Sequence, residues 1–502
     1  NFSSSKKLQF IVYNTQSDFR ESNFAYDDAE FYNQGGITNV YGTKIYLYFD
    51  GNHQHLDQMI RSGIMNIYAH LIVEGESMGA NISSEHLFSV PDWYYIGLAS
   101  YIGDEWNSEL DAFVKNGILS GLYPDFDELS PLDSRYAGHS FWKFIADKYG
   151  KHVIPSILYA TRAYRNFERG FSSVLGVDYK TLQVNWYRHF FVLYKKDSKR
   201  SQPTGESVLS KYKKQRTYSQ FRFSPDGNSF AYVTNEAGQI KIWLKTEDMK
   251  KPRMIFRRYQ KTEDNPDQTF PLLAWHPSGQ ILSFTIEDKG RCYYYPYHVT
   301  EKKTEERRLI DLEKITDLSF SKDGKLMVFT GFKNGQSDIF IYSFIARSIQ
   351  QITNDFYDDA TPRFSENSRY IFFSSKRPHD SLSLSSPKPF YQTETQSTYD
   401  LFRYDYKQKE NQLFRITHTP DANETNIRMI SPNEIIFLSD ENGIKNRYYA
   451  LLDSTISHID TAIHYRYTAT IKPLTDNIFN IQEQDYNASK EVTAEIVLHD
   501  GT

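Results

Sequence analysis

A short motif recurs along the second half of the chain and constrains the fold more than any other feature of the sequence. Each copy places an aromatic or aliphatic residue before a polar residue and a tight turn, and the copies are Phe223–Gly227, Trp275–Gly279, Phe320–Gly324, Phe364–Ser368 and the weaker Ile430–Asn433. A further strand with an Asp at its start follows in two units, at Asp338–Tyr342 and Asp400–Tyr404. Four short strands repeated every ~45 residues are typical of one propeller blade, so we expect an all-β propeller.

The repeated motif resembles the blade of TolB-like propellers, and Thr361–Ser365 is its clearest copy. This resemblance covers about residues 215–500 and implies six blades. Five anchors are visible, and we expect the sixth unit within Thr468–Val497, starting near Ile471–Thr475, although it lacks the Ser-Pro-Asp-Gly anchor.

Two polar segments interrupt the pattern. Residues 196–214 are rich in Lys, Ser and Gln, so we interpret them as a linker between residues 1–195 and a propeller at 215–502. The segment Lys376–Ser397 contains several Pro and Ser residues, and we expect it to form a protruding surface loop, either a contact site or an insertion without function.

The first 195 residues contain two segments that are typical of paired helices in zinc peptidases. The first is Tyr68–Glu74, and the second is Pro91–Tyr101, with the sequence Pro-Asp-Trp-Tyr-Tyr-Ile-Gly-Leu-Ala-Ser-Tyr. Peptide hydrolysis by such a zinc enzyme needs two His residues one helical turn apart, a Glu beside the first His as general base, and a third zinc ligand. Together with strands near Leu8–Tyr13 and Thr43–Phe49, the two segments resemble the MA-like (gluzincin) metallopeptidases over about residues 5–195.

Matched to that family, the sequence has lost nearly every residue that the chemistry requires. His70 stands at the first ligand position, Leu71 replaces the general base, Glu74 replaces the second His and Ile96 occupies the third-ligand position. Leu accepts no proton and Ile binds no zinc. We therefore expect a mostly helical α+β pseudopeptidase domain with no catalytic residues, no metal and no cofactor. His70 and Glu74, spaced i, i+4, are expected to form a mutual hydrogen bond.

Two alternatives remain open. Gly75–Gly79 matches the Gly-x-Ser-x-Gly nucleophile elbow, which would make Ser77 the nucleophile of a hydrolase. A zinc peptidase with aberrant ligands is the other alternative, and the pair His53 and His55 is the next set of donors to test, because no convincing third ligand is found.

Composition limits the partners. The net charge of −5 from 58 basic and 63 acidic residues argues against nucleic acid. Cys292 is the only cysteine, which excludes an intrachain disulfide, and we expect it to be a small buried hydrophobe. No apolar run is long enough to span a membrane. No signal peptide is visible, but Asn1 is not an initiator Met, so we expect either a cleaved leader or a longer chain.

The order of the two domains is similar to that of large TolB-like envelope proteins of Bacteroidota. This resemblance implies a periplasmic or outer-membrane-associated protein whose partners are other envelope proteins in a larger complex. The blades show no nucleophile, base or metal cluster in the sequence, so we expect a protein-binding role. Phe356 and Tyr357, flanked by aspartates, could contact a partner or pack between blades.

Overall fold

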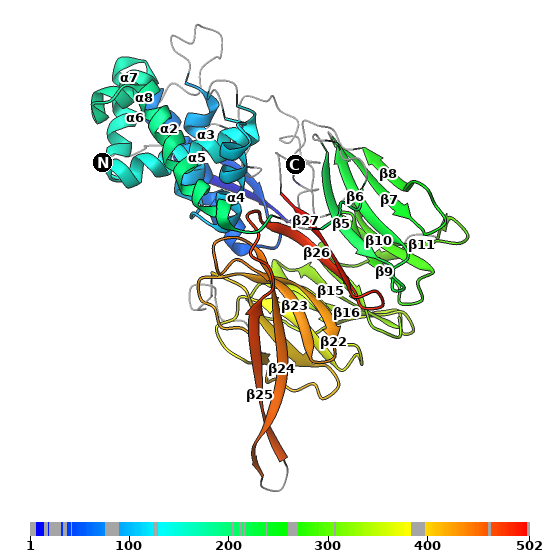
Figure 1. The fold of residues 1–502 in the computed structure, drawn as a ribbon. Helices are drawn as coiled ribbons and strands as arrows, with labels where there is room; N and C mark the ends of the chain where they lie inside the picture. Colours follow the sequence, from blue (N-terminus) through cyan, green and yellow to red (C-terminus); the bar gives the residue numbers. More distant parts are fainter. Residues whose placement is uncertain are drawn as a thin grey trace. The chain divides into compact units, whose positions relative to one another are not determined.

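The computed structural model describes residues 7–14, 19, 32–33, 38–41, 43–75 and 90–498, except for gaps at 124–125, 127–128, 203–204, 210–212, 214–215, 237, 260–269, 289, 306–307, 383–396 and 460–462. The chain divides after Lys199 into two compact units (Figure 1). The first unit is mostly helical with one small sheet, and the second consists of antiparallel sheets.

Seven helices form most of the first unit in the part of the chain that the structure describes. They are α2 (His53–Val73), α3 (Asp92–Gly103), α4 (Ser108–Leu119), α5 (Pro131–Tyr149), α6 (Val153–Tyr164), α7 (Phe167–Leu175) and α8 (Tyr179–Lys195), followed by a 3-10 turn at Lys196–Lys199. Polar side chains cap the N-termini of five of them, namely Asn52, Asn107, Ser130, Asn166 and Asp178. Among these described helices, none is long and apolar enough to cross a membrane.

The small sheet of this unit confirms the strands expected near residues 8–13 and 43–49. It contains β1 (Gln9–Tyr13), β2 (Tyr32–Asn33), β3 (Thr38–Tyr41) and β4 (Lys44–Tyr48), in the order β1-β4-β3-β2. β1 and β4 run parallel, and the other pairs are antiparallel.

The core of the first unit is aromatic, and two glycines bring its central helices together. Trp93, Trp142 and Trp186 are almost completely buried. Where α3 crosses α5, a Cβ added to Gly97 would lie 2.4 Å from the backbone of Gly138. Because this distance is far below van der Waals contact, the helix pair requires glycine at this crossing.

Six antiparallel sheets form the second unit among its described residues. Their strands are β5 (Thr217–Phe223), β6 (Phe230–Glu236), β7 (Gln239–Lys245), β8 (Arg253–Tyr259), β9 (Leu272–Trp275), β10 (Ile281–Asp288), β11 (Arg291–His298), β12 (Lys303–Thr304), β13 (Arg308–Ile310), β14 (Lys314–Phe320), β15 (Leu326–Lys333), β16 (Gln336–Ser343), β17 (Ser348–Gln351), β18 (Asp359–Phe364), β19 (Tyr370–Ser375), β20 (Asp400–Asp405), β21 (Phe414–Arg415), β22 (Glu424–Ser431), β23 (Glu434–Ser439), β24 (Asn446–Ile459), β25 (Ile463–Pro473), β26 (Ile481–Asn487) and β27 (Val492–Val497). Consecutive strands pair within each sheet, as the repeat predicts, except that β13 pairs with β11 beside β12.

The repeated sequence motif forms the turn between the first and second strands of a sheet. In the third sheet the Ser321 hydroxyl bonds Asp323 at 2.7 Å and accepts from the Leu326 amide at 3.0 Å. Gly324 adopts a φ of 70°, which a side chain rarely allows. The motif therefore encodes a turn that ties two strands together, which explains why it recurs in five of the six sheets.

The first strands of the six sheets contact one another in the order β5, β9, β14, β18, β22 and β26, and β26 contacts β5. This is the arrangement of a β-propeller. The expected start of the sixth unit is wrong, because Ile471–Pro473 belongs to β25, the last strand of the fifth sheet. Thr475 follows β25 as Thr353 follows β17, the last strand of the third sheet. The segment Ile471–Thr475 therefore ends the fifth unit and does not begin the sixth. The sixth sheet has only the two strands β26 and β27 among described residues.

Two polar segments differ from simple surface loops. Lys376 and Arg377, which open the expected protruding loop, are buried at 5% and 0% exposure. The expectation is therefore wrong at its start, while residues 383–396 lie outside the described part. Within the linker 196–214, Arg200 pairs with Asp476 of the second unit at 2.8 Å.

Candidate functional site

The positions that the sequence analysis matched to zinc ligands lie at the end of α2 and on α3, and a tyrosine that the sequence analysis did not single out joins them. His70 Nδ1 lies 3.0 Å from Glu74 Oε1, which confirms the expected hydrogen bond. The hydroxyl of Tyr95 donates to the same oxygen at 3.0 Å. The rings of Tyr95 and His70 stack with their centroids 3.8 Å apart. Burial, followed by the charge of Glu74, raises the pKa of Tyr95.

The positions of the general base and the third ligand are apolar and buried. Leu71 belongs to a small core with Ile45 and Leu47 of β4 and Ile67 of α2. Ile96 is 6% exposed. The arrangement therefore offers one imidazole and one carboxylate that already bond each other. In the described part of the first unit, no third His, Cys, Asp or Glu completes a ligand group.

The other histidines considered as ligands have different roles. His55 Nδ1 bonds Asp50 at 2.6 Å at the start of α2, and the His53 ring packs against Phe49. His139 is buried, lies 2.9 Å from the Ser100 hydroxyl, and burial lowers its pKa to about 3. Ser77 and its elbow motif lie outside the described residues.

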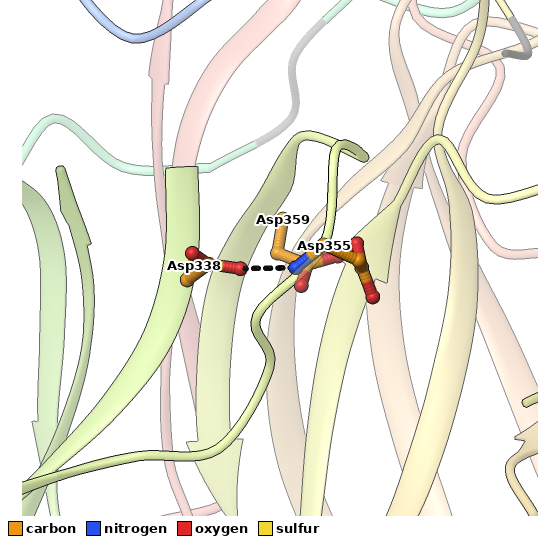
Figure 2. A group of neighbouring side chains, drawn as sticks. All are labelled: Asp338, Asp355 and Asp359. Carbon is orange, nitrogen blue, oxygen red and sulfur yellow. Dashed lines mark hydrogen bonds between the residues drawn. The ribbon is translucent and has the colours of Figure 1, made fainter. Parts of the chain in front are cut away.

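Three aspartates converge where the third sheet meets the fourth (Figure 2). Asp338 lies on β16, Asp359 begins β18 and Asp355 lies in the loop between the sheets. One oxygen from each carboxylate lies within 4.8 Å of the others, and all three residues are buried. The sequence analysis did not predict this cluster. A group of carboxylate oxygens suits a hard cation.

A buried arginine already supplies positive charge to this cluster. One terminal nitrogen of Arg377 donates to both oxygens of Asp359, at 2.9 and 3.0 Å, and the other donates to Asp355 at 3.2 Å. Its Nε donates to the Ser375 hydroxyl at 2.8 Å. Because Arg377 follows β19 and Asp355 precedes β18, these bonds connect the end of β19 in the fourth sheet to the loop that leads into β18. We interpret the cluster as an ion network of the seam between sheets.

One guanidinium cannot neutralise three buried carboxylates. Asp338 accepts from Gln351 at 2.9 Å but receives no bond from Arg377. Burial, together with Asp359 and Asp355, raises the pKa of Asp338 to about 8. Burial also raises the pKa of Asp359, to about 6, against the opposing effect of Arg377. Of the three carboxyls, Asp338 is therefore the one whose protonation the surroundings favour most.

Two buried carboxyls also lie close together where the fourth sheet meets the fifth, and one of the two is bonded to an arginine. Asp400 on β20 is paired with Arg415, whereas Glu424 at the start of β22 accepts from the hydroxyls of Thr417 and Ser439, both at 3.3 Å. Burial, followed by the charge of Asp400, raises the pKa of Glu424 to about 9. The recurrence of an Asp at the start of the third strand was the signal in the sequence that could have revealed both seams.

The two residues considered as partner contacts lie beside the first of these seams. Tyr357 is 8% exposed, meets His379 edge-on at 5.3 Å and lies under the guanidinium of Arg377 at 5.7 Å. Its burial favours the packing role over partner contact. Phe356 is half-buried. Cys292 on β11 is completely buried in an apolar cluster, which confirms the sequence prediction.

Comparison with known proteins gives no family: no family model matches the chain, and no curated protein matches it. Among solved structures, the chain is similar to TolB from Acinetobacter baumannii, with 16% identity, a TM-score of 0.36, and coverage of 46% of this chain and 51% of that one. A putative TolB from Agrobacterium tumefaciens shows 14% identity and a TM-score of 0.36, over 56% of this chain and 90% of that one. The β-propeller domain of the Trilobed protease from Pyrococcus furiosus shows 13% identity and a TM-score of 0.35, over 58% and 91%.

Proposed function

We propose that the chain is a non-catalytic, protein-binding scaffold of the cell envelope and a subunit of an outer-membrane-associated assembly. It combines a degenerate MA-like (gluzincin) peptidase domain with a six-bladed TolB-like propeller. The observation that carries this proposal is the bonding of the former ligand positions to each other. Glu74 is engaged by His70 and Tyr95, and the base position Leu71 is packed against the small sheet.

The bonding of the buried charges in the propeller supports the same proposal. The carboxylates at its seams are bonded to Arg377, to Arg415 or to hydroxyls between sheets. These contacts use the buried charges within the fourth sheet and at its border with the fifth, and they leave the outer loops as the surface for partners.

The relation to metallopeptidases is tested by rebuilding the site. The triple variant Leu71→Glu, Glu74→His and Ile96→Glu restores a general base and three ligands if α2 and α3 have the proposed relation. We expect this variant to hold one zinc per chain and the wild type to hold none, measured by metal analysis after dialysis. A matched variant with Leu71→Gln in place of Leu71→Glu separates zinc binding from hydrolysis, because it keeps the ligands without the base.

The results also distinguish the alternatives. Tightly held zinc in the wild type, with peptide cleavage, would favour a metallopeptidase with aberrant ligands. Labelling by a fluorophosphonate that is lost in Ser77→Ala would favour a serine hydrolase. The scaffold role itself is tested by affinity purification of the full chain from its native envelope, followed by mass spectrometry. Recovery of no envelope protein would contradict it.

A further inference from the structure

Three arginines occupy equivalent positions on the first strands of three sheets. Each lies two residues after a residue with positive φ, at a bulge in the strand, and the pairs are Gln220 with Arg222, Thr361 with Arg363 and Asn426 with Arg428. In each arginine, Nη1 donates to the carbonyl of the preceding residue at 2.7–2.8 Å. The three side chains therefore leave their strands in the same way, and their Nη2 groups can be compared directly.

Carboxylates from two other sheets meet these arginines around the inner strands of the propeller. Arg363 pairs with Asp317 of β14, Arg222 with Glu483 of β26 and Arg428 with Asp485 of β26. The side chains of Asp317 and Glu483 are 16% and 20% exposed, so solvent reaches this charged cluster.

Two of the three Nη2 groups are satisfied by the protein. In Arg363 the group contacts both oxygens of Asp317, at 3.2 and 2.9 Å. In Arg222 it donates to Gln220 Oε1 at 3.0 Å. The Nη2 group of Arg428 is buried and has no partner among the described residues. A buried donor without an acceptor costs about 1–3 kcal/mol, and such groups are rare.

The missing partner has a simple cause. Asn426 stands where Gln220 stands beside Arg222, but its side chain is one methylene shorter, and its Oδ1 is likewise buried without a partner. Asp485 cannot accept from both Nε and Nη2 of Arg428 either. Its Oδ1 accepts from Arg428 Nε at 2.8 Å, while its Oδ2 accepts from the Phe223 amide at 2.8 Å.

The charge around Arg428 is also less balanced than around Arg222. Burial, followed by Arg363 and Arg222, lowers the pKa of Arg428 to about 9, and Asp485 and Asp317 offset this only in part. The carboxylates near Arg222 raise its pKa despite burial. The surroundings of Arg428 therefore favour one additional negative charge.

We propose that Arg428 and Asn426 form a binding site for a small carboxylate at the inner strands of the propeller. One carboxylate oxygen accepts from Arg428 Nη2, and the other accepts from the Asn426 amide, whose NH₂ end is presented by rotation about χ2. A single negative charge matches the single unpaired donor group. The ligand needs few atoms, because the side chain of Arg428 is only 8% exposed and nearby side chains must shift to admit it.

The full-length chain and acetate, with chloride at equal ionic strength as the reference anion, test this site. We expect acetate to raise the Tm of the propeller transition saturably, with half-saturation at roughly millimolar concentration. Asn426→Gln should raise the starting Tm and abolish the acetate response, because the longer amide bonds Arg428 as Gln220 bonds Arg222. The positive φ is compatible with Gln, since Gln220 has a φ of 54°.

The reciprocal variant is the matched control. Gln220→Asn should lower the starting Tm and increase the acetate response, because it leaves the Nη2 group of Arg222 without its acceptor. The proposal is overturned if acetate stabilises the wild type no more than chloride does, or if Asn426→Gln responds to acetate as strongly as the wild type. These outcomes do not depend on the scaffold role, which the envelope purification tests separately.

Discussion

The helical unit and the propeller differ in the side chains that they bury. The helical unit packs Trp93, Trp142 and Trp186 among other aromatic rings around close helix crossings. The propeller divides its interior into apolar clusters that each lie between two neighbouring sheets, and it buries charged side chains such as Arg377 and Arg428 beside them. Apolar packing is indifferent to pH, whereas the stability of buried ion networks depends on protonation. The two units should therefore respond differently to the same perturbation.

The largest expected effect is the loss of the buried guanidinium at the third seam. Arg377→Ala leaves Asp355 and Asp359 buried without their cation, and breaking a buried ion pair typically costs about 3–5 kcal/mol. We expect the propeller transition in calorimetry to fall sharply while the helical transition is unchanged. Exposed Arg347→Ala is the matched control. An equal loss in both transitions would show that the units do not unfold separately.

A second variant perturbs only the helical unit. Gly97→Ala places a methyl group against the backbone of Gly138, and overpacking of this kind costs about 1–3 kcal/mol or more. The helical transition should fall and the propeller transition should remain. Gly121→Ala, where a Cβ meets nothing within 4 Å but φ is positive, should be milder. A tolerated Gly97→Ala would contradict the described crossing of α3 and α5.

Acidification should affect the two transitions through different buried groups. Glu424 has a raised pKa of about 9, so its stabilising effect is complete below its ordinary value and is lost as pH rises through about 9. His139 has a lowered pKa of about 3, so its contribution is present above its ordinary value and is lost as pH falls through about 3. Between pH ~8 and ~5 each group contributes at most about 1.4 kcal/mol per pH unit.

The direction of each effect can be assigned with single variants. Glu424→Gln should flatten the gain of the propeller on acidification, because the neutral amide mimics the protonated carboxyl. Asp338→Asn should do the same at the third seam, where the pKa is about 8. A propeller transition that loses stability as the pH falls over this range would contradict the assignment of protonated carboxyls.

The smallest expected effect is at the pair of His70 and Glu74. Glu74→Gln keeps an acceptor for Tyr95 and removes a half-exposed charge next to His70. Partly exposed pairs contribute about 0–1 kcal/mol, so we expect a change of at most a few degrees in the helical transition. A much larger loss would show that the pair stabilises the α2–α3 contact.

The sequence determined those parts of the structure that depend on neighbouring residues in the chain. The anchor motifs identified the turns of the blades, because Ser321, Asp323 and Gly324 form one local hydrogen-bonded unit. The two peptidase-like segments located the end of α2 and the whole of α3, and the i, i+4 separation was sufficient to predict the bond between His70 and Glu74.

Tertiary structure decided which distant residues meet, and local periodicity carries no information about that. Asp338, Asp359 and Arg377 come from different strands and form one cluster only after two sheets are placed side by side. The prediction of a surface loop that begins at Lys376 was wrong for this reason, because a Lys-Arg pair before a Pro- and Ser-rich stretch has the composition of an exposed loop. The unpaired nitrogen of Arg428 depends on a difference of one methylene between Gln220 and Asn426. Hydrogen bonds are satisfied over a few tenths of an ångström, and only the packed fold sets distances on that scale.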